Sequence, residues 1–246
     1  MTRTASTKTA ADRPRSQHSE SAVAPVDVWL GQVDHPVDHT SRAWLDAAEL
    51  ARADRFSFDR DRDRFINRRA LVRAVLARYL ESPPADIQIR VASHGRPELA
   101  GGGDLSFNVS HSDGLALVAV AYGHSVGVDI ERLRPVPDGL ELARGLFHQR
   151  ELEALESVPE SQRSAAFLAI WTRKEAIVKA DGRGLSIPLD RFDVLPLDGH
   201  DTGRPRGQRG NLPFVFTDLR ASDDWIGAVV LDDQNAMPRV ALLEAP

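Results

Sequence analysis

Three acidic residues and a lysine have spacings that could bring them together. Residues 126–131 have the sequence VGVDIE, which predicts a strand with Asp129 and Glu131 on the same face, because residues two apart in a strand share a face. Glu175 and Lys179 lie one turn apart on a helix predicted for the sequence WTRKEAIVKA. If this helix packs over the end of the strand, carboxylates and an ammonium group converge. Such a group suits a divalent cation beside a phosphate.

Each of these residues also has an interpretation without chemistry. Asp129 and Glu131 could be solvated acids at a strand end, and Glu175 with Lys179 could form an ordinary helical ion pair that contributes about 0.2–0.5 kcal/mol. Gly127 favours the interpretation as a functional site, because a residue without a side chain lets another backbone approach closely.

The composition of the chain excludes several kinds of site. The 246 residues contain no cysteine, which excludes disulfides, thiolate ligands and a cysteine nucleophile, so any metal must be held by oxygen or imidazole. We expect a reducing, cytoplasmic location. No run of about 18 apolar residues occurs, which predicts no membrane span. The net charge of −5 argues against nucleic-acid binding, which usually needs a basic surface.

Three long helices are predicted. Residues 52–80 have apolar side chains at helical spacing and arginines over the remaining surface; we expect most of these arginines to form exposed ion pairs and two or three to face a phosphate. A second helix is predicted over residues 140–155. The third covers residues 161–180 and ends at Gly182, which suits a left-handed C-cap.

The strands alternate with these helices. Residues 115–121 are uniformly apolar, as in a buried strand, and we expect them to pair with residues 126–131 as a hairpin at the centre of the sheet. The order of elements hints at two similar halves, residues 25–122 and 123–246, after a polar tail over residues 1–24 that we expect to be disordered. Further strands are predicted over residues 26–33, 87–91, 105–112, 185–194, 214–219 and 225–231.

Three separate motifs match one family in order and spacing. SFNVSHS precedes the buried strand, VGVDIE follows it, and FLAIWTRKEAIVKADGRGL comes later. Together they resemble the 4'-phosphopantetheinyl transferases of the large, surfactin-activator type, over about residues 52–189. The resemblance implies an α+β fold of two pseudo-equivalent halves, each a small sheet packed on a long helix. It also implies Mg²⁺-dependent transfer of the 4'-phosphopantetheine arm of coenzyme A to a serine of an acyl- or peptidyl-carrier protein, with release of 3',5'-adenosine bisphosphate.

The resemblance assigns roles to the acids and to the lysine. Asp129, Glu131 and Glu175 correspond to the metal-binding acids of the family, and this match favours the metal interpretation over solvated acids. Asp129, Glu175 and Lys179 are therefore the expected catalytic residues. Lys179 is expected to bind a coenzyme phosphate, with a lesser contribution from Lys174. Either Glu175 or a water at the metal would take the proton of the carrier serine.

The same resemblance predicts the residues that bind coenzyme A. His111 corresponds to a contact with the phosphate end of the coenzyme, and Arg96 to a basic residue near its adenosine end. A basic residue that the family has three positions before Arg52 is Glu49 in this chain, which leaves the binding of the 3'-phosphate partly unassigned. The expected coenzyme-binding set is Arg52, Arg96, Ser110, His111 and Lys179.

The expected partner is a carrier protein, which by resemblance is acidic in most known cases. A basic docking surface could then lie among the arginines of residues 52–73 or 204–209. The chain length favours a monomer, the type in which one chain supplies both halves. Two other functions are possible: a non-catalytic module that binds coenzyme A or a nucleotide, and a metal-dependent hydrolase with water as the acceptor.

Overall fold

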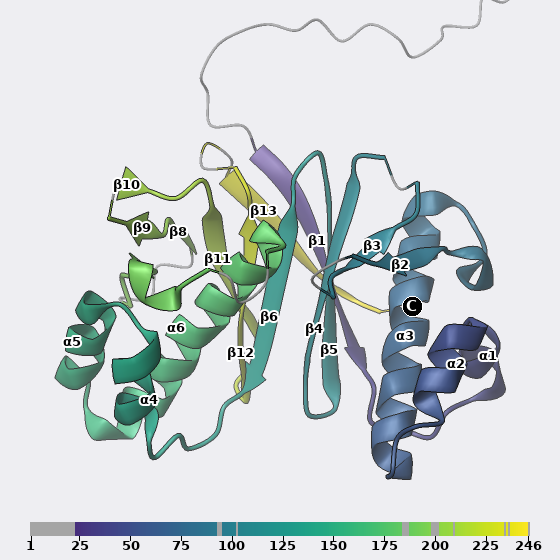
Figure 1. The fold of residues 1–246 in the computed structure, drawn as a ribbon, viewed down its shortest axis with the longest axis horizontal. Helices are drawn as coiled ribbons and strands as arrows, with labels where there is room; N and C mark the ends of the chain where they lie inside the picture. The colour runs from purple at the N-terminus through teal and green to yellow at the C-terminus, as the bar shows by residue number, and fades with distance from the viewer. Residues whose placement is uncertain are drawn as a thin grey trace, which may run out of the picture.

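Two four-stranded sheets form the centre of the molecule, and a long helix covers the outer face of each (Figure 1). The computed structural model describes residues 23–92, 95–101, 103–183, 187–197, 202–208, 210–233, 235 and 237–245. Most of the predicted tail lies outside these residues. Its last two residues, Val23 and Ala24, belong to the first strand, because they pair with the strand at the other end of the chain.

The first sheet has the strand order β13, β1, β5, β4. Helix α3 (Asp59–Leu80) packs on one face, where Val72 and Leu76 share a buried cluster with Val118 and Val120 of β5. The strands are β1 (Val23–Gln32), β4 (Leu105–Ser112), β5 (Leu115–Tyr122) and β13 (Met237–Glu244). This half also contains α1 (His39–Ala43), α2 (Ala47–Ala53), the 3-10 helix η1 (Pro84–Asp86), β2 (Ile89–Val91) and β3 (Pro97–Leu99).

The second sheet has the strand order β6, β12, β11, β8. Helix α6 (Glu160–Asp181) packs on it through Ile177 and Ala180, and it ends at Gly182 with a φ of 79°, the predicted left-handed cap. The strands are β6 (Val126–Arg132), β8 (Thr202–Gly203), β11 (Val215–Ser222) and β12 (Trp225–Leu231). Smaller elements are α4 (Gly139–Leu146), α5 (Gln149–Ser157), η3 (Leu189–Arg191), β7 (Phe192–Asp193), β9 (Arg206–Gly207) and β10 (Gly210–Asn211).

The inner faces of the two sheets share one hydrophobic core. Val28 of β1 and Leu117 of β5 lie in the same buried cluster as Val128 of β6 and Val229 of β12. The resulting layers are helix, sheet, sheet and helix, which confirms the predicted α+β fold of two halves, each with a small sheet on a long helix. Within the described residues, no helix is long and apolar enough to span a membrane.

Side chains of β4 join the two halves. Asn108 Oδ1, Ser110 Oγ and Ser112 Oγ accept hydrogen bonds from the backbone N–H groups of residues 128, 130 and 132 in β6, at 3.1, 3.3 and 3.2 Å. The predicted central hairpin of residues 115–121 with 126–131 is therefore wrong. Both edges of β5 are already paired, to β1 and to β4, and β6 pairs with β12 instead.

Several predicted boundaries are also wrong. The helix predicted over residues 140–155 is two helices, because the backbone at Phe147 is extended and His148 begins a new capping box with Glu151. Phe147 and Leu155 are both buried, although they lie on either side of the break. Their eight-residue separation therefore resembles the spacing of apolar residues in one continuous helix. The helix predicted over residues 52–80 is likewise divided between α2 and α3. Of the predicted strand over residues 185–194, only residues 192–193 form a strand among those described.

The sequence patterns missed the last strand. β13 pairs in parallel with β1 over eight residue pairs, from Val23 with Met237 to Leu30 with Glu244. The hairpin of β11 and β12 is therefore not the last element of the chain. The predicted second half, residues 123–246, contributes β13 to the sheet of the first half. The division of the chain at residues 122–123 therefore does not coincide with the division between the two sheets.

A buried ion pair anchors α6 to α5. The Nζ atom of Lys174 lies 2.8 Å from Glu151 Oε2, and both side chains are 0% exposed. Lys174 also donates hydrogen bonds to the carbonyl oxygens of Leu189 and Phe192, at 2.7 and 2.6 Å. All the donors of its ammonium group are thereby used in the core. Lys174 therefore does not contribute to the site, contrary to the prediction.

Replacing Lys174 with Met should lower the free energy of unfolding by about 3–5 kcal/mol, because Glu151 would stay buried without its counter-ion. Urea unfolding at neutral pH measures this loss. The matched control is Arg144→Met, which removes a pair with Glu156 whose side chains are 59% and 49% exposed, and should cost only about 0–1 kcal/mol. Equal effects of the two substitutions would contradict the anchoring role.

Gly127 allows α6 to lie directly on β6. A Cβ atom at this position would lie 2.0 Å from the carbonyl oxygen of Ala176 and 2.5 Å from the backbone nitrogen of Ala180. No side chain can be accommodated at those distances unless the helix moves. Since α6 carries Glu175 and Lys179, this contact also sets their distance from the acids of β6.

We expect Gly127→Ala to lower the free energy of unfolding by at least about 1–3 kcal/mol, because the helix must shift away from the strand. Gly145→Ala is the control, since Gly145 lies in α4 with open space around it, and alanine there should be neutral or stabilise by about 0.5–1 kcal/mol. Urea unfolding of both variants tests the difference. Wild-type stability of Gly127→Ala would show that the close approach is not required.

Candidate active site

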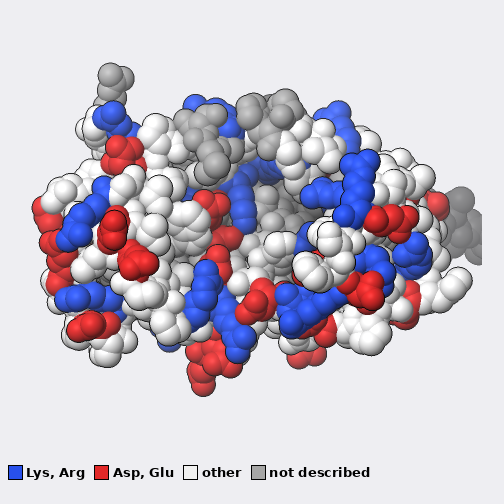
Figure 2. Space-filling view, turned by 60° about the horizontal axis from the view of Figure 1, so that its bottom comes forward, with Lys and Arg blue, Asp and Glu red and all other residues white. Residues whose placement is uncertain are grey.

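A pocket of about 450 Å³ lies between the two halves. Figure 2 shows a hollow on this side of the molecule, with basic and acidic side chains beside each other at its rim. One wall comes from α2 and α3, and the opposite wall from β4, β6 and α6. Of the predicted site residues, the pocket is lined by Arg52, Ser110, His111, Asp129 and Lys179.

Lys179, Asp129 and Ser110 form the polar centre of this pocket. Lys179 Nζ lies 2.6 Å from Asp129 Oδ1, and Ser110 donates a hydrogen bond to the same oxygen at 2.7 Å. Lys179 also donates to the carbonyl oxygen of Val128 at 3.1 Å. The helix–strand contact thus places the lysine against the middle of β6, and not over its end as expected from the sequence. Its ion-pair partner is Asp129 and not Glu175, so the ordinary helical ion pair does not form.

One carboxylate oxygen of Asp129 has no partner among the described residues. Asp129 is only 6% exposed, and its Oδ2 atom is buried and accepts no hydrogen bond from them. Burial raises the pKa of Asp129, and the charge and hydrogen bond of Lys179 partly counteract it. A buried, unsatisfied carboxylate oxygen is costly unless a ligand completes its coordination. This oxygen is suited to a cation.

Glu175 lies close enough to the acids of β6 to be affected by their charge. Burial raises the pKa of Glu175, the negative charge of Asp129 raises it further, and Lys179 counteracts part of the shift. The carboxylate forms no side-chain hydrogen bond or ion pair among the described residues. Repulsion between these carboxylates would be relieved by a divalent cation.

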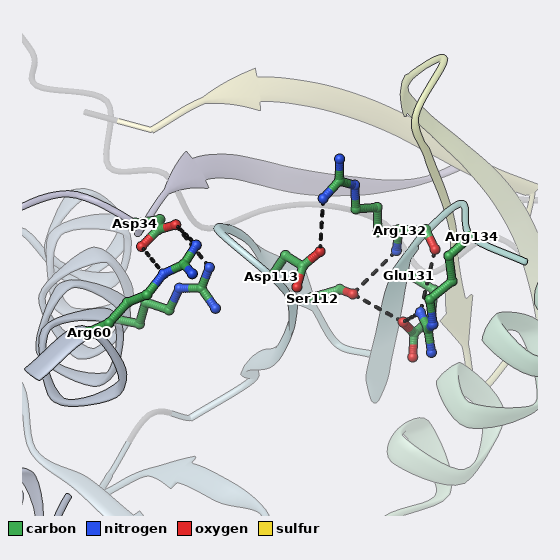
Figure 3. A network of polar contacts seen from close by, with 8 residues as sticks. Asp34, Arg60, Ser112, Asp113, Glu131, Arg132 and Arg134 are labelled. Carbon is green, nitrogen blue, oxygen red and sulfur yellow. Dashed lines mark hydrogen bonds and ion pairs between the residues drawn. The ribbon is translucent and has the colours of Figure 1, made fainter. Parts of the chain in front are cut away.

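Glu131 points to the same face of β6 as Asp129, as predicted. Its Oε2 atom accepts hydrogen bonds from Ser112 Oγ at 3.0 Å and from the guanidinium of Arg134 at 2.9 Å (Figure 3). Ser110 with Asp129 and Ser112 with Glu131 are therefore successive serine–carboxylate pairs between β4 and β6. In the same view, Arg132 of β6 donates a hydrogen bond to Asp113, which lies in the turn between β4 and β5.

The three acids do not form a ready metal centre. Among the described residues, no group of three or more His, Asp or Glu side chains is arranged to hold a metal. The donor set itself fits a hard cation such as Mg²⁺, because it consists of carboxylates, one of which has an unpartnered oxygen. Asp129, Glu131 and Glu175 stay the predicted ligands.

His111 extends from β4 into the pocket. The surrounding protein lowers the pKa of the imidazole, and the positive charges of Arg68 and Lys179 lower it further. The neutral form of His111 is therefore favoured at neutral pH, and it can donate one hydrogen bond to a phosphate.

Arg96 occupies a different position from the other predicted ligands. Its guanidinium donates hydrogen bonds to the carbonyl oxygens of Ala180 and Val126, at 3.1 and 3.4 Å, and to Ser106 Oγ at 3.4 Å. It thus joins the first half to the end of α6. The pocket is lined by the neighbours of Arg96, Gly95 and Pro97, and not by its side chain. A role of Arg96 in binding the coenzyme stays a prediction.

Glu49 does not repel a phosphate, because its charge is neutralised. Arg69 and Arg73 both form ion pairs with its carboxylate, with Arg73 Nη2 at 2.8 Å. Glu49 also completes the capping box of α2 with Asp46. The unexpected acid at this position is therefore part of the scaffold of the first half.

Two residues of α3 that line the pocket were not assigned from the sequence, namely Arg68 and Arg69. They follow Phe65 by three and four positions and precede Val72, which also lines the pocket, so one helical face carries all four residues. This helical spacing is the feature of the sequence that could have identified the two arginines. It is hard to recognise because arginines occur on all sides of the helix.

Comparison with known proteins gives two family matches that together cover both halves. Residues 125–230 match the 4'-phosphopantetheinyl transferase superfamily, and residues 37–122 match the N-terminal model of 4'-phosphopantetheinyl transferases.

Individual relatives agree with these matches. The 4'-phosphopantetheinyl transferase HetI of Nostoc sp. is 40% identical over 177 residues, which are 69% of this chain and 73% of HetI. A relative from Synechocystis sp. is 35% identical over 213 residues, 82% of this chain and 85% of the relative. The transferase Sfp of Bacillus subtilis is 33% identical over 146 residues, 59% of this chain and 64% of Sfp. With matches over both halves and over most of its relatives' length, this chain belongs to the 4'-phosphopantetheinyl transferase superfamily.

Proposed function

We propose that this protein transfers the 4'-phosphopantetheine arm of coenzyme A to a serine hydroxyl of an acyl- or peptidyl-carrier protein, with release of 3',5'-adenosine bisphosphate. Membership of the transferase family supports the reaction class. The single observation that carries the assignment of the site is the contact of Lys179 with Asp129, beside an unpartnered carboxylate oxygen and inside a pocket of about 450 Å³.

The basic groups of the pocket bind the pyrophosphate of the coenzyme. The ammonium group of Lys179 and the imidazole of His111 both line the pocket, so a cation and a hydrogen-bond donor can face phosphoryl oxygens there. Fixed donors of this kind stabilise the charge that develops as the pyrophosphate bond breaks, because they need no reorganisation during the reaction.

The proposed metal ligands are Asp129, Glu131 and Glu175. A bound Mg²⁺ would neutralise the charge on the phosphoryl oxygens and orient the pyrophosphate. Ser112 donates a hydrogen bond to Glu131, and Ser110 donates one to Asp129. Both carboxylates are therefore positioned by a serine of β4.

Glu175 also has a suitable environment for accepting the proton of the carrier serine. Its pKa is raised by burial and by Asp129, which brings the carboxylate closer to the range in which a general base is effective at neutral pH. This proton transfer would increase the nucleophilicity of the serine oxygen as it attacks the phosphorus.

The partner and the location are proposed on broader grounds. The pocket takes residues from both halves of one chain, which supports a monomer as the active unit. A cytoplasmic location agrees with a sequence that has no cysteine. On charge alone, the arginines of residues 52–73 or those of residues 204–209 are the candidate docking surface for an acidic carrier protein.

Asp129→Asn and Glu175→Gln should each lower kcat/KM for carrier modification by at least about 100-fold, because each removes a charged group from the reacting centre. Intact-mass spectrometry of an apo carrier protein, incubated with coenzyme A and Mg²⁺, detects the added phosphopantetheine arm. A chelator should abolish the wild-type reaction. The control is Glu160→Gln, an exposed position in the first turn of the same helix.

Two results would count against this assignment. Full activity of Asp129→Asn would exclude the proposed metal role of that residue. If the wild-type protein modifies no carrier from fatty-acid, polyketide or peptide synthesis but still binds coenzyme A, the non-catalytic module becomes the better description.

The affinity for Mg²⁺ should increase with pH. Burial raises the pKa of Asp129 and, together with the charge of Asp129, that of Glu175, whereas Lys179 opposes both shifts. At low pH these carboxylates hold protons, which a cation must displace, so the affinity should change by up to about tenfold per pH unit for each displaced proton. Calorimetric titration at several pH values measures this slope. Glu175→Gln should bind more weakly with a shallower slope; an unchanged slope would exclude Glu175 as a titrating ligand.

A further inference from the structure

A second pocket, of about 530 Å³, lies on the opposite side of α3 from the active-site pocket. The residues of α3 that line this second pocket are Asn67, Ala70, Leu71 and Ala74. Those that line the active-site pocket are Phe65, Arg68, Arg69 and Val72. At about 100° per residue, the two sets lie on opposite faces of the helix. The second pocket shares no lining residue with the first, so it is a separate cavity.

The C-terminal end of the chain closes this pocket. β13 ends beside α3 (Figure 1), and the backbone N–H of Ala245 donates a hydrogen bond to the carbonyl oxygen of Leu30 at 2.8 Å. Glu244 and Ala245 then line the pocket together with Trp44, which follows α1. The walls of the pocket therefore come from the first sheet and the helices beside it.

One buried polar atom of this pocket has no partner among the described residues. Asn67 is only 4% exposed, and its Nδ2 atom donates hydrogen bonds to the carbonyl oxygens of Val33 and His35, at 3.2 and 2.8 Å. These two bonds fix the orientation of the amide and leave Oδ1 buried without a hydrogen bond. A buried acceptor without a donor is unfavourable, so a ligand that offers an N–H group would be stabilised here.

The charged groups of the pocket favour a positively charged donor. Asp38 and Glu244 line it, and among the described residues no lysine or arginine does. Asp38 stays ionised, because a hydrogen bond from the backbone N–H of Ser41 lowers the pKa of its carboxyl. Glu244 is exposed and forms no ion pair or side-chain hydrogen bond with the part of the chain that the structure describes. An ammonium group would therefore be attracted to this pocket.

The remaining lining suits an apolar body. The indole of Trp44 is half-buried at the pocket, and Leu71 and Leu115 add aliphatic surface. An aromatic ring can pack on the indole, and a cation near the face of the indole is attracted to its π electrons. The volume of the pocket is within the range of sites for small organic ligands, about 300–1,000 Å³.

We propose that this pocket is a second binding site, which takes a small organic amine with a protonated ammonium group on a compact apolar or aromatic body. The ammonium group donates to Asn67 Oδ1 and is attracted by the carboxylates of Asp38 and Glu244. The body packs on Trp44 and Leu71. This site goes beyond the proposed transfer reaction and does not depend on it.

Titration of ¹⁵N-labelled protein with phenethylammonium, a compact aromatic amine, tests the site by nuclear magnetic resonance. The chain contains four tryptophans, which give separate indole N–H signals, and among them only Trp44 lines the pocket. The signal that disappears in Trp44→Phe identifies this residue. It should move more than the other three, with a dissociation constant of about 1 mM or below. Equal shifts of all four signals would refute a defined site.

Two further probes test the charge of the ligand. Phenethyl alcohol has the same aromatic body without a charge, and hydrocinnamate has a similar body with a negative charge. Both should bind at least about fivefold more weakly than phenethylammonium, because the carboxylates of the pocket attract only the cation. Equal affinity for the three probes would overturn the proposed selectivity for an amine.

Two variants test the lining of the pocket. Glu244→Gln removes a charge at an exposed position and should weaken the binding of phenethylammonium about two- to fivefold, with no effect on phenethyl alcohol. Ala74→Leu fills part of the pocket and should weaken both probes by at least about tenfold. The matched controls are Glu141→Gln and Ala51→Leu, which replace exposed helical residues outside the pocket and should change neither affinity. Wild-type affinity of both pocket variants would refute the site.

Coenzyme A separates this site from the active site. At saturating coenzyme A and Mg²⁺, phenethylammonium should still shift the Trp44 signal with an unchanged dissociation constant, because the two pockets lie on opposite faces of α3. Displacement of the amine by coenzyme A would place it in the active-site pocket and refute a second site. The titration needs neither transfer nor a carrier protein, so a failure of the proposed reaction would leave this result unaffected.

Discussion

The hydrogen bonds from the side chains of β4 to the backbone of β6 are the contact on which the rest of the site depends. Asn108, Ser110 and Ser112 take the place of a strand partner at the edge of β6, so the two sheets meet without forming one continuous sheet. Because residues two apart share a face, the same row of side chains also reaches the acids that alternate along β6. Ser110 and Ser112 therefore hold the halves together and position Asp129 and Glu131 at the same time.

The close approach of α6 to β6 adds the second half of the site. Gly127 has no side chain to separate them, and Lys179 then reaches Asp129 across the contact. Lys174, five residues earlier in the same motif, points the opposite way and is enclosed with Glu151. The helix is thus fixed on both sides, by a buried ion pair on one and by a backbone contact on the other. This rigidity suits a centre that must hold charged groups at set distances.

Among the described residues, some polar groups of the pocket between the halves have no partner. Asp129 pairs with Lys179 through Oδ1, but its buried Oδ2 accepts no hydrogen bond, and Arg52 and Arg68 form no ion pair with an acid. Both arrangements are unfavourable in the free protein and would be stabilised by ligands of the opposite charge. The proposed binding of coenzyme A together with a cation would satisfy both ends at once.

Local patterns were sufficient for part of this description. The period of two in β6 placed Asp129 and Glu131 together, the apolar run of residues 115–121 indicated a buried strand, and Gly182 marked the end of α6. These features depend only on the geometry of a single strand or helix. The resemblance of three motifs to one family then indicated the reaction and five of the residues that line the pocket, and a periodicity alone could not have done so.

Sequence by itself therefore indicated β4, β5, β6 and α6, the acids and the family, because these follow from neighbours along the chain. Only the tertiary structure decided which elements meet: β5 pairs with β1 and β4 and not with β6, and β13 returns to the first sheet. It also decided which of many similar charges are neutralised, since Arg69 and Arg73 pair with Glu49 whereas Arg68 does not. The pairing of a charge depends on groups that are distant in sequence and close in space, and no local pattern contains that information.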